Sequence, residues 1–75
     1  MPSNFYHQVY GECESYFKKN TAAFLDNQIK LHLFKDKESV SLADKFELAK
    51  WIWLSSALVL GKEESKLLAD KIISL

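Results

Sequence analysis

The sequence predicts a small all-α domain, and three observations lead to that fold class. Apolar residues recur every three or four positions along most of the 75 residues, which is the spacing of one face of a helix. Residues suited to starting or ending a helix stand between these periodic stretches. Apolar residues make up 48% of the chain, which is rich enough for a folded core. We therefore expect a single helical domain over residues 1–75, with four helices packed around the third.

The first helix is expected over residues 4–19, where the amphipathic pattern is clearest. Apolar side chains there occupy a continuous arc of roughly 140° on a helical projection. Ser3 or Asn4 can cap the first amides, and Lys18 and Lys19 suit the negative C-terminal end of the helix. The apolar arc consists of Phe5, Tyr6, Val9, Tyr10, Cys13, Tyr16 and Phe17.

A second helix is expected over about residues 21–35, because Ala22, Leu25, Ile29 and Leu33 repeat at helical spacing. The same region also alternates between apolar and polar residues with a period of two. A short β-hairpin over residues 28–42 is therefore an alternative, which would make the fold α+β. Its turn would lack Gly, Asn and Pro, so the helix is the preferred prediction.

The central helix is expected over residues 41–60. Ser41, followed three positions later by Asp44, resembles a capping box at its start, and Gly61 supplies its end. One apolar stripe is expected to face the core, and it consists of Leu42, Phe46, Ala49, Trp53, Ala57 and Leu60.

The last helix is expected over residues 62–74, with Leu68, Ile72 and Leu75 on its apolar side. Glu63 and Glu64 lie in its first turn, where negative charge is favourable. Because the connection to the preceding helix is very short, these two helices must be neighbours.

A second apolar stripe lies on the other side of the central helix and consists of Trp51, Leu54 and Leu58. Two interpretations remain open. The other helices bury this stripe inside the monomer, or it stays exposed and binds a protein partner or a second copy of the chain. Tryptophan is a typical anchor at the centre of such interfaces. Phe24 and Leu31 would extend the partner-binding surface.

No motif for catalysis, a cofactor or a metal is recognisable. Cys13, His7 and His32 follow no metal-binding spacing, and no base is placed beside the single cysteine by any known pattern. The only glycines are Gly11 and Gly61, so there is no phosphate-binding loop. We therefore expect a non-enzymatic protein without a cofactor, a metal or a small-molecule substrate.

Charge argues against nucleic acid as the main partner. Ten lysines balance ten acidic residues, and there is no arginine, the residue that reads bases best. The alternative to a protein-binding role is a helix-turn-helix DNA-binding regulator, since Ala57 and Gly61 are spaced like the small residue and turn glycine of that motif. Its recognition helix would, however, begin with two glutamates that phosphates repel.

The expected setting is the cytoplasm. A single cysteine cannot form an internal disulfide and suits a reducing compartment. The longest uncharged run, Trp51 to Gly61, is too short to span a bilayer. The sequence thus favours a small protein-protein interaction module, an adaptor or an inhibitor of a larger complex. Regulators carried by phages and other mobile elements often have this profile, which is an association and not a deduction from residues.

Overall fold

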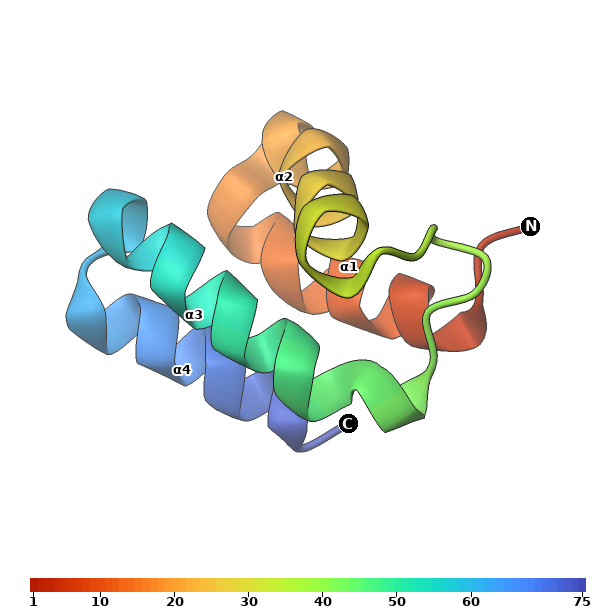
Figure 1. Ribbon diagram of the computed structural model, residues 1–75. Coiled ribbons are helices and arrows are strands. Elements are labelled where there is room, and N and C mark those ends of the chain that lie inside the picture. Colours follow the sequence, from red (N-terminus) through yellow and green to blue (C-terminus); the bar gives the residue numbers. More distant parts are fainter.

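The chain is helical, and the computed structural model describes all of residues 1–75. No strand forms, so the prediction of an all-α fold is confirmed. In Figure 1, α3 and α4 lie side by side, and α2 is seen nearly end-on beside α1. The helices are α1 (Asn4–Phe17), α2 (Thr21–Gln28), α3 (Lys45–Leu60) and α4 (Lys62–Ile73). Shorter turns are a 3-10 turn at Lys18–Asn20, a π-helical turn at Ile29–Leu33 and a 3-10 turn at Leu42–Asp44.

Capping residues that are visible in the sequence set the start of α1 and the start of α3. Ser3 caps α1, since its hydroxyl accepts a hydrogen bond from the Tyr6 amide at 3.1 Å. Ser41 and Asp44 form the expected capping box before α3, with the Ser41 amide donating to the Asp44 carboxylate at 2.9 Å. These contacts satisfy amides that the first helical turn leaves without partners.

The hairpin alternative over residues 28–42 is wrong. The second helix instead continues through the π-helical turn Ile29–Leu33 and stops at Phe34, whose φ of 55° lies in the left-handed region. The helical conformation buries Ile29 in the core, whereas an isolated two-stranded hairpin is only marginally stable. The following loop is held by Asp36, which accepts hydrogen bonds from two later amides, and by the buried side chain of Val40.

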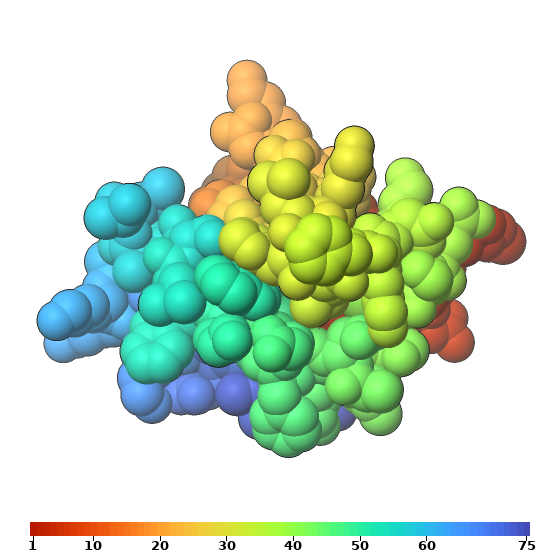
Figure 2. All heavy atoms as spheres, in the orientation of Figure 1, coloured from red at the N-terminus to blue at the C-terminus, as the bar shows by residue number.

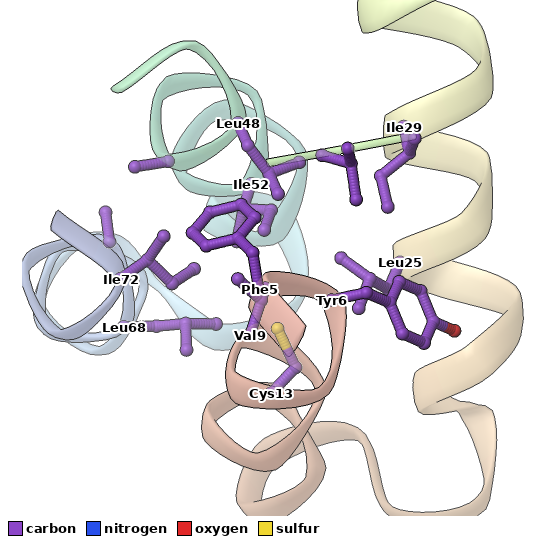
Figure 3. Close-up of a cluster of buried hydrophobic side chains, with 13 residues drawn as sticks. Phe5, Tyr6, Val9, Cys13, Leu25, Ile29, Leu48, Ile52, Leu68 and Ile72 are labelled. Atoms are coloured by element: carbon purple, nitrogen blue, oxygen red, sulfur yellow. The ribbon is translucent and has the colours of Figure 1, made fainter. Parts of the chain in front are cut away.

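The core takes residues from all four helices, with four of its thirteen residues from α1 and three each from α3 and α4. In Figure 3, Phe5 and Val9 of α1 lie among apolar side chains from all the other helices. The core is therefore not arranged around the third helix alone. The surrounding side chains are Leu25 and Ile29 near α2, Leu48 and Ile52 on α3, and Leu68 and Ile72 on α4.

The face of α3 that enters the core differs from the predicted one. Leu42, Phe46 and Trp53 were expected inside but are exposed, whereas Ala49 of the same predicted stripe is buried as expected. The buried face is offset from the predicted stripe by about one residue position, roughly 100° around the helix. A serine can occupy this face because the Ser56 hydroxyl donates to the carbonyl of Ile52 within the same helix. The buried residues are Leu48, Ala49, Ile52 and Ser56.

The connection between α3 and α4 is Gly61 alone. Its φ of 87° is accessible to glycine at little cost, and its amide donates to the Ala57 carbonyl at 2.9 Å. The chain reverses there, so α3 and α4 run antiparallel along their lengths (Figure 1). None of the helices combines the length and apolar character that crossing a bilayer requires.

The position of the buried face of α3 is testable by truncation of one residue on each face. We expect Ile52→Ala to lower the free energy of unfolding by about 2–5 kcal/mol, because it opens a cavity in the core. Phe46→Ala should cost about 1 kcal/mol or less, since most of that side chain already contacts water. Urea unfolding at low protein concentration measures both values. A larger loss of stability for Phe46→Ala than for Ile52→Ala would instead support the predicted stripe as the buried face of α3.

The capping box has a pH dependence that can be measured. Burial of the Asp44 carboxyl tends to raise its pKa, but the Lys35 ammonium at 2.9 Å and the Ser41 amide outweigh burial and lower the pKa. The stabilisation is therefore present above the unfolded-state pKa of about 3.9 and is lost as pH falls through the lower folded-state pKa. We expect Asp44→Asn to cost about 1 kcal/mol at neutral pH and progressively less in acid.

Urea unfolding at a series of pH values checks this expectation. Glu14→Gln is a matched control, because Glu14 is exposed and its carboxylate forms no ion pair. A constant difference between Asp44→Asn and the native chain at all pH values would contradict the assignment.

Candidate functional site

The outer face of α3 is defined here by Phe46, Trp53, Leu54 and Leu58, which are large apolar side chains left in contact with water. Their exposed fractions are 64%, 42%, 55% and 95%, respectively. The core takes only a narrow arc of α3, and these four residues lie outside that arc. Exposed apolar residues that stand alone are ordinary, but several on one helix are a feature of interaction sites.

A groove runs between α3 and α4 beside this outer face. It consists of two hollows of about 410 and 220 Å³ that share Trp53 and Lys66, so Trp53 stands at its middle. We call this feature the α3–α4 groove. Its apolar lining comprises Phe46, Ala49, Trp53, Leu54, Ala57, Ala69 and Ile73.

The groove results from short side chains between α3 and α4 and large side chains beside them. Ala49 and Ala57 on α3 and Ala69 on α4 have short side chains, which leaves a hollow between the helices. Phe46 and Trp53 are large and stand beside that hollow. Residues 46, 49, 53 and 57 follow helical spacing and therefore share one side of α3.

Charged residues of both signs border the groove. Lys66 pairs with Asp70 at 3.1 Å, and Lys50 pairs with Glu47 at 3.4 Å. Both pairs are exposed, so they contribute little to the stability of the monomer. Lys62 and Glu63 line the groove without an ion pair of their own. An apolar centre with a polar margin is the common anatomy of a protein interface.

Trp51 is placed differently from the expectation of an exposed anchor. Its ring stacks on His32 with centroids 4.0 Å apart and planes 4° from parallel. Its indole N–H donates to Glu47 at 3.1 Å, and the Lys50 ammonium lies 4.8 Å from the ring centroid. The chain itself thus covers one part of the Trp51 side chain and leaves the other part exposed.

The other predicted partner-binding residues are distributed over two regions. Leu54 and Leu58 lie on the outer face of α3 and are exposed as expected. Leu31 is exposed in the π-helical turn, next in sequence to His32. Phe24 is separate from them in its contacts, because its ring stacks on Phe17 with centroids 4.1 Å apart.

Sequence reasoning missed Phe46 and Trp53 as surface residues and assigned them to the core. One signal for their exposure was available. Lys50 lies four positions after Phe46 and three before Trp53, so a charged side chain shares their side of the helix. The buried residues Leu48 and Ile52 are followed at the same helical spacing by Ser56, which carries no charge.

Cys13 and Tyr6 are the titratable side chains that the fold buries. Cys13 is fully buried, and this burial, with a smaller effect of Glu12, raises the pKa of its thiol to about 12. No three His, Cys, Asp or Glu side chains gather closely enough to hold a metal ion. Tyr6 donates its hydroxyl to Asp26 at 2.7 Å, and burial, together with that hydrogen bond, raises its pKa well above the usual value.

A larger hollow of about 630 Å³ lies at the end of the second helix. Three of its five charged side chains are engaged within the chain, whereas Lys30 and Lys37 have no ion-pair partner. Asp26 accepts from Tyr6, Asp36 accepts from amides of its own loop, and Lys35 donates to Asp44. Phe34 is its only hydrophobic lining residue and is itself exposed, so the hollow is bordered mainly by charged side chains.

Helices α3 and α4 do not have the arrangement of a helix-turn-helix. That motif sets its two helices at roughly 90–120°, with a turn of three or four residues. Here a single residue joins them, and they lie antiparallel against each other (Figure 1). Comparison of the chain with protein-family models, with curated proteins and with solved structures gave no match.

The protected state of Cys13 is testable with a thiol reagent. We expect the folded protein to react with a disulfide such as Ellman's reagent only as fast as it unfolds, because the thiol is buried and its thiolate fraction is small at mildly alkaline pH. Unfolded protein in guanidinium chloride serves as the control and should react at once. Equally fast labelling of the folded chain would contradict this and make Cys13 a reactive thiol.

Proposed function

We propose that this chain is a non-enzymatic four-helix interaction module that binds another protein chain through the outer face of α3 and the α3–α4 groove. Its role would be that of an adaptor, or of an inhibitor or regulator of a larger complex. The observation that carries the proposal is the run of exposed apolar side chains from Phe46 to Leu58 beside an apolar hollow.

The size of this surface supports the proposal. The outer face of α3 leaves roughly 500 Å² of apolar side-chain area in water, taking roughly 150–250 Å² for each fully exposed large side chain. The largest apolar patch on a typical monomer covers about 300–600 Å² and is often functional. Here the patch is also concave in part, which lets a partner bury side chains on both of its walls.

Trp53 takes the anchor role in this proposal. It lines both hollows, it is partly exposed, and its indole N–H donates to no group of the chain. Large aromatic residues at the centre of an interface often contribute most of the binding free energy. Trp51 and Leu31 would form the margin of the binding surface near the π-helical turn. Phe24 would contribute only the part of its ring that Phe17 does not cover.

The charge pattern favours a protein over a nucleic acid as the partner. The chain has a formal net charge of zero, and cations and anions alternate around the groove. No feature of α3 and α4 favours the DNA-binding alternative. A cytoplasmic location belongs to the same proposal and is supported by the free thiol of Cys13, which suits a reducing compartment.

Site-specific photo-crosslinking tests the proposed surface in cells that produce the chain. A benzophenone amino acid in place of Leu58 should form a discrete crosslinked product, because this side chain is 95% exposed beside the groove. The same substitution at Leu67, an exposed leucine of α4 outside the groove, is the matched control and should give none. Adding Trp53→Ala should remove the Leu58 product while leaving the helical circular dichroism unchanged.

The result that would contradict the proposal is equally definite. If a benzophenone at Leu58 gives no product with any protein, with other copies of the chain included, the outer face of α3 is not a binding surface. The same conclusion follows if the Leu67 control gives the same products.

A further inference from the structure

We infer that the chain occupying the α3–α4 groove is a second copy of this protein, related to the first by a two-fold axis, so that α3 and α4 of both copies form one four-helix interface. The inference rests on the proposed function, because it names the partner for the same surface. Two antiparallel helix pairs stacked face to face are a common way to bury apolar helix faces.

The surface has the shape that a two-fold interface needs. In such an interface the same patch serves both copies, so it must contain a projection and a matching hollow. Leu58 projects almost fully into water from α3. Leu54 and Ala57, which line the larger hollow of the groove with Trp53, precede Leu58 by four positions and one position. The two-fold operation can place Leu58 of each copy against the hollow of the other.

The available area is sufficient for a stable dimer. Two copies of the outer face of α3 contribute roughly 1,000 Å² of apolar area, and the groove walls and lysine stems add to it, which brings the total to the roughly 1,200–2,000 Å² of a specific interface. A dimer of this kind covers Phe46 and Trp53 as well as the two leucines. Figure 2 shows part of this region, where the atoms of α3 reach the molecular surface beside those of α4.

The charges at the borders of the groove favour a second copy of the chain over a partner whose charges are mostly of one sign. The groove borders carry Lys50, Lys62 and Lys66 together with Glu47, Glu63 and Asp70. A strongly acidic or basic partner would meet as many repulsive as attractive groups there. A second copy brings the same balanced set, and its formal net charge of zero produces no long-range repulsion between copies.

The small size of the domain adds a reason for self-association. Only 17 of the 75 residues are buried, and a domain of this length has a core of marginal size. Dimerisation places the aromatic side chains that the monomer leaves outside into a second apolar region. The folded state then gains stability that depends on protein concentration.

The experiment is the mass of the full chain measured by sedimentation and light scattering from micromolar to millimolar concentration. We expect the mass to rise from one copy to two. Leu58→Asp places a carboxylate in the interface twice and should raise the dimer dissociation constant by about 100-fold or more. Leu67→Asp, the matched control on the other side of α4, should leave the dissociation constant unchanged within about twofold.

A second measurement remains decisive even if Leu58→Asp fails to fold. In the Trp51→Phe variant, Trp53 is the only tryptophan, so its fluorescence reports on the groove alone. As concentration rises, its emission should shift to shorter wavelength and its quenching by acrylamide should fall, because the second copy covers its ring.

The outcomes separate this inference from the proposed function. A chain that stays monomeric at every concentration, with constant quenching of Trp53, overturns the dimer. If the benzophenone at Leu58 then captures another protein and never a second copy, the proposed function stands and only the identity of the partner is wrong. If it captures nothing, both fail together.

Discussion

The one-residue connection at Gly61 is the constraint on which the rest of the structure depends. Because α4 begins one residue after α3 ends, the two helices have to fold back against each other. Gly61 permits the reversal with a positive φ that other residues adopt only at a cost. Ala49 and Ala69 then lie where the helices meet, and their small side chains leave the α3–α4 groove open to solvent. The reversal at Gly61 therefore produces both the side of this helix pair that enters the core and the groove on its other side.

The core explains why so much apolar surface is left over. The apolar stripe of α1 lies between α2 on one side and the pair of α3 and α4 on the other (Figure 3). Leu48 and Ile52 are the large side chains that α3 contributes to this core. Phe46, Trp53, Leu54 and Leu58 lie outside this buried part of α3, and the fold leaves them exposed. Their exposure costs free energy that a partner would recover by burying them.

Under the proposed function, the site would recognise its partner by shape. The only thiol is buried, which raises its pKa, and the ion pairs near the groove are exposed. The groove provides an apolar floor, an aromatic ring with a free donor at its middle, and balanced charges at its margin. These are the elements of a protein interface, in which a few anchor residues supply affinity and the margin supplies specificity.

The amino-acid sequence by itself determined the all-α class, the starts of α1 and α3, and the end of α3. Ser3, the pair of Ser41 and Asp44, and Gly61 act through hydrogen bonds and backbone angles within a few residues, so local chemistry is sufficient to predict them. The apolar stripe of α1 was predictable for a similar reason, since charged residues mark its other side.

Only the tertiary structure decided which side of α3 is buried. That helix is apolar over nearly its whole circumference, so its pattern does not select a face. The choice depends on where α4 and α2 with its π-helical turn lie. The same contacts cover Trp51 with His32 and leave Trp53 in the groove. They also settle residues 28–42 as a helical turn and loop, because Ile29 and Val40 gain burial from side chains distant in sequence, which local spacing does not encode.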